Sequence, residues 1–305
     1  MLHPDLARAR FLPRVSLGPR LLRLVRRASV PAAPVGAGLV VEDVRLEEPA
    51  GGLRVRLYRP AELPLPTAAL LWLHGGGFVL GSPEQDDRTC LAIASRLGMT
   101  VASVDYRLAP EHPFPAALDD AWAALGWLLD HSTERQIDPA RIAVGGASAG
   151  GGLAAALAQR VRDQGLVELP LQVLVYPMLD DRTGAVGTPT PKDLRVWTPE
   201  SNRFAWASYL RTTARDGRVP YAVPARCEHL AGLAPAWIGV GTEDLFHDED
   251  ADYARRLIEA GVPTQFTVVP GAFHGFDAAF PGQEVSRRFL DEQVAALSAA
   301  LFPAA

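Results

Sequence analysis

Short apolar runs recur along this chain, separated by segments with helical periodicity. The runs alternate little with polar residues, which is typical of strands covered on both faces of a sheet. They lie at residues 68–73, 100–104, 141–144, 171–175, 236–240 and 265–269, and the clearest helical periodicities lie at 119–129, 153–161, 250–258 and 289–301. Strand and helix in this order predict a mostly parallel sheet with right-handed crossovers, flanked by helices.

Two regions depart from this pattern. Residues 39–46 and 53–58 alternate apolar and polar side chains around a turn at 49–52, which predicts an antiparallel hairpin. Residues 180–218 form a long connection that is rich in turn-forming and aromatic residues. Connections of this length in a compact domain usually act as lids or binding loops. Since no linker or repeat is evident, we expect a single domain over residues 1–305.

The composition excludes several classes of protein. The 305 residues carry a net charge of −5, whereas nucleic-acid and anionic-membrane partners favour a dominant basic surface. Two cysteines are too few for a disulfide framework, and the arginine-rich N-terminus lacks the apolar core of a secretory signal. We therefore expect a cytoplasmic protein with no membrane insertion. The prolines near the N-terminus predict a helical arm that is interrupted rather than one long helix.

The sequence GASAG at 146–150 directly follows the apolar run 141–144 and precedes a helical segment. A sharp turn from strand to helix would lift the hydroxyl of Ser148 clear of the sheet, with small neighbours allowing the backbones to approach. The alternatives are a glycine-rich turn used only for packing and a phosphate-binding turn. A Walker loop is excluded because no Gly-Lys-Ser/Thr occurs here.

The sequence HGGGF at 74–78 directly follows another apolar run. Consecutive glycines allow backbone amides to converge on one point, which is the requirement for binding an oxyanion. Gly75, Gly76 and Gly77 are the candidate donors in this loop, and the amide of Ala149, after the nucleophile, is the other.

These two motifs, with the sequence DYRLAPEHPFP at 105–115 between them, resemble the hormone-sensitive lipase family of α/β-hydrolases, in its bacterial carboxylesterase branch. The resemblance extends from about residue 70 to residue 276. It implies an eight-stranded, mostly parallel sheet, a helical cap and esterase chemistry without a cofactor. We expect about residues 1–38 and about 180–218 to contribute that cap.

A serine hydroxyl needs a base that a carboxylate orients, and in this fold the chain order is serine, acid, histidine. Of the seven histidines, only His274 follows a full helix and strand beyond the acid-rich stretch at 243–250. Glu243, Asp244 and Asp248 compete as the acid. The family resemblance aligns the catalytic carboxylate with Asp244, although Leu245 replaces the family's proline.

Other features of the sequence qualify this alignment. Ala147 and Leu153 stand where the family often has an acid and an asparagine, which affects hydrogen bonding around the turn. The acids from Asp248 onward match several ligand positions of a calcium loop, but Tyr253 occupies the position that requires glycine. We therefore expect no metal, and the family resemblance implies no cofactor.

The sequence thus predicts a serine carboxylesterase that hydrolyses short- to medium-chain esters through an acyl-enzyme, with a small-molecule ester as its partner and a homodimer left open. Two alternatives remain. One is a receptor-like pseudo-hydrolase that only binds a ligand, against which the retained His274 argues. The other is an amidase or thioesterase that uses the same three residues.

Overall fold

The computed structural model describes residues 1–28, 30–47, 52–62, 66–211 and 219–303. The strands in these residues are β1 (Leu39–Leu46), β2 (Leu53–Pro60), β3 (Thr67–Leu73), β4 (Thr100–Val104), β5 (Ile137–Ala147), β6 (Gln172–Val175), β7 (Ala236–Gly241) and β8 (Thr264–Val269). They form one eight-stranded sheet in the order β1-β2-β4-β3-β5-β6-β7-β8.

The helices of the described residues lie before, between and after these strands. The α-helices are α1 (Pro19–Val25), α2 (Asp87–Leu97), α3 (Ala116–Asp130), α4 (Ala149–Gln164), α5 (Pro199–Leu210), α6 (His247–Glu259), α7 (Phe276–Ala279) and α8 (Glu284–Leu301), and the 3-10 helices are η1 (Pro4–Phe11), η2 (Pro83–Asp86) and η3 (Pro224–Arg226).

The sheet is mostly parallel, which confirms the predicted α/β class. Strands β1 and β2 pair antiparallel, as do β2 and β4, and every later neighbouring pair is parallel. The predicted hairpin is β1 and β2, with Leu46 opposite Leu53. Most of its predicted turn, residues 49–51, lies outside the described residues.

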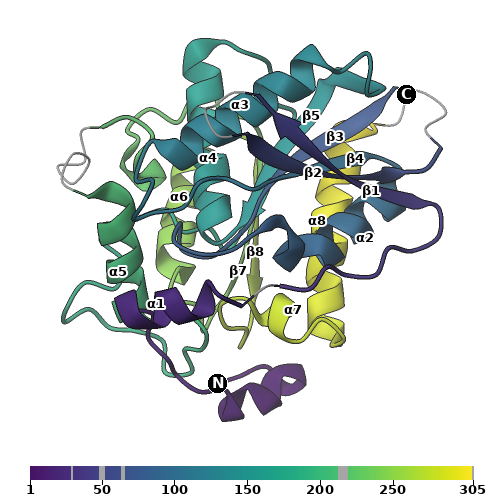
Figure 1. Ribbon diagram of the computed structural model, residues 1–305. Coiled ribbons are helices and arrows are strands. Elements are labelled where there is room, and N and C mark those ends of the chain that lie inside the picture. Colours follow the sequence, from purple (N-terminus) through teal and green to yellow (C-terminus); the bar gives the residue numbers. More distant parts are fainter. Residues whose placement is uncertain (29, 48–51, 63–65, 212–218, 304–305) are drawn as a thin grey trace.

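Both faces of the sheet are covered, as β3 illustrates. Every residue of this strand is buried. Ala69, Leu71 and Leu73 belong to one apolar cluster, whereas the alternate residues Leu70 and Trp72 belong to the other. Helices α3, α4 and α6 cover one face, and α2 and α8 cover the opposite face (Figure 1). This two-sided burial explains why the central strands read as continuous apolar runs.

The structure extends several predicted elements and adds others. Strand β5 runs over Ile137–Ala147 rather than 141–144, and α4 begins directly at Ala149. Helices α2 and α5 were not predicted from periodicity. Helix α5 lies within the long connection 180–218, whose last seven residues, 212–218, lie outside the described residues.

The topology sets where loops can meet. Strands β3 and β5 are neighbours, with Leu73 paired to Gly146, so the segments that follow them leave the sheet side by side. Strands β7 and β8 are neighbours as well, with Gly241 paired to Val269. In open α/β sheets, ligand sites form outside the carboxyl ends of the strands. The two glycine motifs and the acid- and histidine-bearing loops all emerge at that edge.

Candidate active site

Ser148 stands between the last residue of β5 and the first residue of α4. Its backbone has φ 57° and ψ −120°, a strained conformation for a residue with a Cβ. The Ser148 amide donates to the carbonyl of Val175 at 2.8 Å, which fixes the turn against β6. At Gly150, an added Cβ would lie 1.9 Å from the carbonyl oxygen of Leu73. Glycine is therefore required for the turn to close onto β3.

The structure brings Ser148, His274 and Asp244 into one hydrogen-bonded line. His274 Nε2 lies 2.8 Å from Ser148 Oγ, and His274 Nδ1 lies 2.9 Å from Asp244 Oδ2. The exposed fractions of the three residues are 6%, 5% and 1%. The amide of Phe246 donates to the other carboxylate oxygen of Asp244 at 3.0 Å, so both oxygens are engaged. Such an arrangement holds an imidazole in one tautomer and aims it at a hydroxyl.

The other two candidate acids, Glu243 and Asp248, do not contact His274. Glu243 accepts a hydrogen bond from the amide of Asp193 at 3.1 Å and contacts the amino group of Met1. Asp248 is exposed and lies 2.8 Å from the ring of His247. Of the three carboxylates that the residue pattern left open, only Asp244 contacts His274.

Aromatic rings surround His274 on several sides, and the sequence analysis did not assign them to the site. The ring centroid of Tyr176 lies 4.8 Å from that of His274, and the ring centroid of Phe246 lies 5.0 Å away at 90°. Trp197 lies further out, at 6.4 Å. Tyr176 follows directly after β6, so its place at the carboxyl edge was the only available signal.

The glycine loop after β3 lies against the serine. A Cβ added at Gly75 would lie 3.5 Å from the Cβ of Ser148. Gly76 has φ 119°, and a Cβ there would lie 2.0 Å from the carbonyl oxygen of Leu80. Within the described residues, the amides of Gly76, Gly77 and Ala149 donate no hydrogen bond outside regular helices and strands. They are available to a negatively charged oxygen beside Ser148.

The buried side chain of His74 holds this glycine loop in place, a role that the sequence alone does not indicate. It is fully buried and stacks on Tyr106 with ring centroids 4.1 Å apart. Its Nδ1 lies 2.8 Å from the carbonyl oxygen of Gly75, and the hydroxyl of Tyr106 donates to the His74 carbonyl at 2.7 Å. Burial lowers the pKa of His74 to about 4. The ring is thus neutral and can donate from Nδ1 to hold the loop.

A cavity of about 520 Å³ opens onto Ser148 and His274. Its walls are mostly apolar and come from distant parts of the chain. Those contributed by the N-terminal segment and the connection before α5 are Val15, Leu17, Leu21, Val196 and Trp197. This volume lies in the range typical of small-molecule sites.

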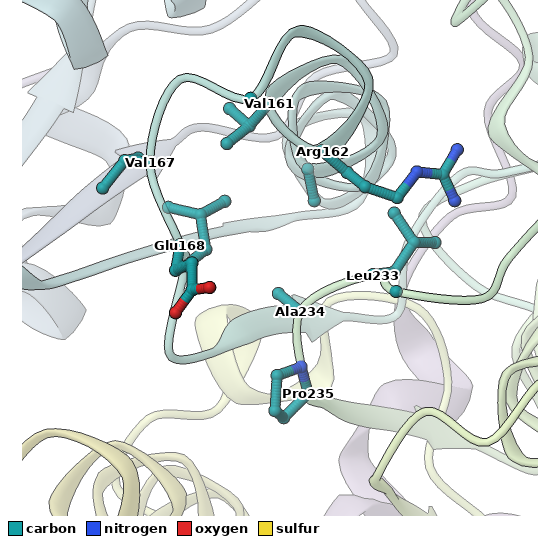
Figure 2. A pocket seen from close by; sticks show the side chains of 11 residues that line it. Val161, Arg162, Val167, Glu168, Leu233, Ala234 and Pro235 are labelled. Atoms are coloured by element: carbon teal, nitrogen blue, oxygen red, sulfur yellow. The ribbon is translucent and has the colours of Figure 1, made fainter.

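A second cavity, of about 680 Å³, lies at the amino ends of β6 and β7, away from these residues (Figure 2). Arg162 and Glu168 line it, but their charged groups point in different directions. Arg162 Nη1 already donates to the carbonyl of His229 at 2.6 Å. No nucleophile, base and acid converge in this cavity.

The calcium-loop alternative is wrong because Asp248, Asp250, Asp252 and Glu259 lie on the continuous helix α6. Asp252 and Glu259 both pair with Arg255 on the helix surface. In the described ranges, the structure shows no cluster of three or more His, Cys, Asp or Glu residues placed to hold a metal ion.

Known proteins that are similar to this chain are described as hydrolases and esterases. A family model described as alpha/beta hydrolase fold matches residues 70–278. Esterase LipI of Mycobacterium tuberculosis is 38% identical over 258 residues, covering 82% of this chain and 79% of that esterase. An ethyl acetate hydrolase of Pseudomonas putida is 37% identical over 227 residues, covering 73% of this chain and 71% of that hydrolase.

The solved structure of a bacterial heroin esterase superimposes with a TM-score of 0.90 at 36% identity, and the match covers 98% of each chain. Among the described helices of the present chain, each is too short or too polar to cross a lipid bilayer.

Proposed function

This chain belongs to the alpha/beta hydrolase family, in the bacterial esterase branch that resembles hormone-sensitive lipase, and we propose that it hydrolyses short- to medium-chain carboxylic esters with Ser148 as the nucleophile. The relatives described above are named as an esterase, an ethyl acetate hydrolase and a heroin esterase. The observation that carries the proposal is the buried line from Ser148 Oγ through His274 to Asp244, with spacings of 2.8 and 2.9 Å.

In the first half of the reaction, Ser148 Oγ attacks the ester carbonyl carbon while His274 Nε2 accepts the hydroxyl proton. The carbonyl oxygen becomes an oxyanion, which the amides of Gly76, Gly77 and Ala149 bind by hydrogen bonds. The bond from the carbonyl carbon to the alcohol oxygen then breaks, and His274 returns the proton to the departing alcohol. The acyl group remains on Ser148.

In the second half, water replaces the alcohol. His274 accepts a proton from water, the hydroxide oxygen attacks the acyl carbon, and the same amides bind the second oxyanion. The bond from the acyl carbon to Ser148 Oγ then breaks, Oγ takes the proton back from His274, and the carboxylic acid leaves. Throughout, Asp244 fixes the ring orientation of His274 and stabilises the imidazolium that forms in each half.

The N-terminal segment and the region before α5 together form the cap in this proposal. Ser16 Oγ lies 2.9 Å from Thr198 Oγ1, and the amide of Leu17 donates to Ser201 Oγ at 2.8 Å. Arg195 Nε donates to the carbonyl of Ala9 at 2.9 Å. These bonds join two segments that are far apart in sequence into one wall over the cavity, which supports a role for both in shaping the acyl site.

Two further proposals concern the setting of the enzyme. We place it in the cytoplasm, because its two cysteines are unpaired. A homodimer is the second proposal, supported by the edge strand β8, where Val268 is 37% exposed and the outer edge of the strand is unpaired among the described strands. Sedimentation equilibrium of the purified chain tests the dimer.

The decisive test of function is Ser148→Ala. We expect kcat on p-nitrophenyl butyrate to fall by at least about 10⁴-fold, because no other group supplies the nucleophile. Labelling by a fluorophosphonate probe, which attacks activated serines, should be lost in the same variant. Ser298→Ala, at a half-buried position of α8 that does not line the cavity, is the matched control and should keep both signals. Retained turnover or labelling in Ser148→Ala would refute the assignment.

The same reaction sequence could in principle release an amine or a thiol. Initial rates on an ester, a thioester and an anilide with the same acyl group separate these activities. The present proposal expects the ester to be the best of the three, and a faster anilide would overturn it in favour of an amidase.

A further inference from the structure

A third cavity, here called the chamber, lies next to the cavity of Ser148. It has a volume of about 570 Å³ and shares part of its wall with the 520 Å³ cavity of Ser148. The shared wall consists of Gln85, Asp86, Ala147, Tyr176 and Ala278. The chamber therefore lies directly beside the cavity that holds Ser148.

The chamber contains two carboxylates that the proposed reaction does not use. Asp86 accepts a hydrogen bond from Trp72 Nε1 at 2.8 Å, and Asp277 accepts one from the hydroxyl of Tyr176 at 2.8 Å. Both side chains line the chamber and are partly exposed to it. In the part of the chain that the structure describes, neither carboxylate has an arginine or lysine nitrogen within 4.0 Å.

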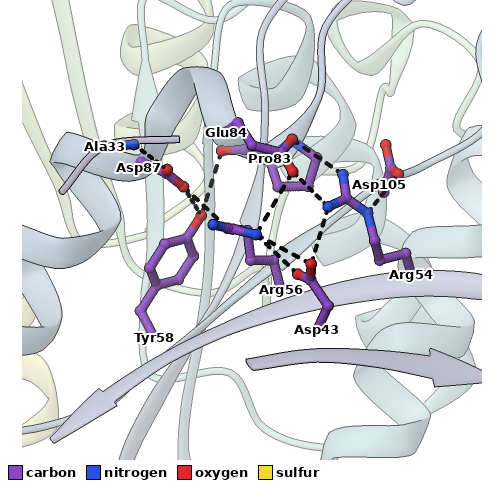
Figure 3. Close-up of polar contacts among 9 residues, drawn as sticks. All are labelled: Ala33, Asp43, Arg54, Arg56, Tyr58, Pro83, Glu84, Asp87 and Asp105. Carbon is purple, nitrogen blue, oxygen red and sulfur yellow. Dashed lines mark hydrogen bonds and ion pairs between the residues drawn. The ribbon is translucent and has the colours of Figure 1, made fainter. Parts of the chain in front are cut away.

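The acids next to Asp86 in the sequence, Glu84 and Asp87, are both paired with arginines. Glu84 accepts hydrogen bonds from two nitrogens of Arg54, and Asp87 pairs with Arg56 Nε at 3.2 Å (Figure 3). Asp87 also accepts a hydrogen bond from the hydroxyl of Tyr58 at 2.6 Å. The sequence places three acids within four positions, at 84, 86 and 87, and arginines pair with the outer two. Asp86, which faces the chamber, has no such pairing.

The rest of the wall also suits a positive group. Trp72 and Tyr176 line the chamber and offer aromatic surfaces, which attract cations. Ser286 and Gln293, 4% and 1% exposed, line it as well. Ser286 Oγ and Gln293 Oε1 have no hydrogen-bond partner among the described residues, although both are buried. Buried polar atoms without a partner are uncommon, and these two oxygen atoms add partial negative charge to the chamber wall, which favours a cation.

Resting on the proposed esterase function, we propose that this chamber is a subsite for a cationic substituent, and that the preferred substrates are esters that carry an ammonium group. The carbonyl would sit at Ser148 while the ammonium group lies between Asp86 and Asp277, against Trp72 and Tyr176. The bound cation would supply the positive charge that no arginine or lysine of the described chain provides to these two carboxylates.

The ionisation of these acids gives the subsite a pH dependence. Burial, with a smaller contribution from Asp277, raises the pKa of Asp86 to about 7, and burial also raises the pKa of Asp277. The other charged groups facing the chamber are Glu84, Asp87 and the exposed Arg88 and Arg287 at its rim. Since Asp86 loses its charge as the pH falls through about 7, cation preference should weaken from pH 8 to pH 6.

The test compares acetylcholine with 3,3-dimethylbutyl acetate, a neutral ester of the same shape. We expect kcat/KM to be at least about tenfold higher for acetylcholine at pH 8. Asp86→Asn should lower this ratio at least about fivefold, and Asp86→Asn combined with Asp277→Asn should bring it to about one. Because the measured quantity is a ratio, any loss of folded or active protein cancels. Asp252→Asn, which removes the same charge on the outer surface of α6, is the control and should leave the ratio unchanged.

The outcomes separate this inference from the proposed function. If the wild type hydrolyses both esters at equal kcat/KM, or if the preference survives in the double variant, the subsite is overturned and the esterase function stands. If the wild type hydrolyses neither these two esters nor p-nitrophenyl butyrate, the proposed function is at fault. Calorimetric titration of Ser148→Ala with the two esters then still decides the subsite, since tighter binding of acetylcholine supports it and equal binding overturns it.

Discussion

Serine at position 148 adopts a backbone conformation that most side chains avoid, with φ 57°. The surrounding structure imposes it, because β5 ends one residue before and α4 begins one residue after. The strained turn holds Oγ against His274, where a relaxed turn would point it elsewhere. In the same way, Asp244 owes its role to position, because the neighbouring carboxylate of Glu243 contacts Met1 and Asp193 instead.

This difference between neighbouring acids can be tested directly. Asp244→Asn should lower kcat on p-nitrophenyl butyrate by about 10³- to 10⁴-fold, since the amide cannot stabilise the imidazolium of His274 and favours the wrong tautomer. Glu243→Gln is the matched control and should stay within about twofold of the wild type. Equal losses in the two variants would mean that the acid has been assigned to the wrong residue.

The residue pattern alone left three candidates for the acid, and only the family resemblance favoured Asp244. The sequence does not encode which carboxylate turns inward, because that depends on how the loop after β7 closes over β8. The same limit applies to Asp86. In the sequence it is one of three acids in the run PEQDD. It differs from the other two only in the structure, where arginines of β2 pair with Glu84 and Asp87 but not with Asp86.

At the scale of elements, the order of strands and helices follows from the apolar periodicity because the central strands are covered on both faces. The ends of elements follow less well, and helices α2 and α5 were not predicted. In α5, Trp206 and Tyr209 are buried around Phe78, with ring centroids 5.3 and 4.0 Å from it. A contact between residues so distant in sequence leaves no periodic signal in either segment.

The junction of β5 and α4 depends on the absence of a side chain at Gly150. Gly150→Ala would place a methyl group 1.9 Å from the carbonyl oxygen of Leu73, so the helix or the strand must shift. We expect the free energy of unfolding to fall by about 3 kcal/mol, and activity to fall more than about 100-fold as Ser148 moves. Urea unfolding and kinetics with p-nitrophenyl butyrate measure the two effects.

The control for this change is Gly126→Ala in α3, where an added Cβ meets nothing within 4 Å. Alanine is the better helix former, so this variant should be more stable by up to about 1 kcal/mol with unchanged kinetics. If Gly150→Ala behaved like Gly126→Ala, the tight approach of α4 to β3 would be disproved.

The whole molecule combines buried groups whose ionisation is shifted in opposite directions. Burial raises the pKa of Asp86 to about 7 and raises the pKa values of Glu249 and Asp250. These groups bind protons more tightly in the folded state, so they add stability as the pH falls from 8 toward their unfolded pKa values. Glu84 and His74 act in the opposite sense. The Arg54 hydrogen bond lowers the pKa of Glu84 to about 2, and burial lowers that of His74 to about 4.

His74 therefore removes stability as the pH falls below 6.5, its unfolded pKa, toward 4, and Glu84 does so as the pH falls below 4.5 toward 2. Asp277 belongs with the raised carboxyls, because burial raises its pKa as well. Since these four carboxyls oppose one imidazole between pH 7 and 5, we expect maximal stability between about pH 5 and 6. The free energy of unfolding there should exceed that at pH 8 by on the order of 2 kcal/mol.

Urea unfolding at pH 3, 5.5 and 8 measures this profile. Asp86→Asn should reduce the gain between pH 8 and 5.5, because one of the contributing protons is removed. A molecule that is more stable at pH 8 than at pH 5.5 would contradict the balance of buried charges described here.

The N-terminal segment packs against the loop that follows β8 and against the start of α8. The amide of His3 donates to the carbonyl of Gly271, and the amide of Val285 donates to the carboxylate of Asp5. Domains generally begin to fold while the ribosome is still synthesising them. In this protein Asp5 and Val285 are 280 positions apart, so their hydrogen bond, like that of His3 with Gly271, forms only once both segments have been synthesised. The wall that the N-terminal segment contributes to the catalytic cavity is therefore fixed in place only after β8 is available.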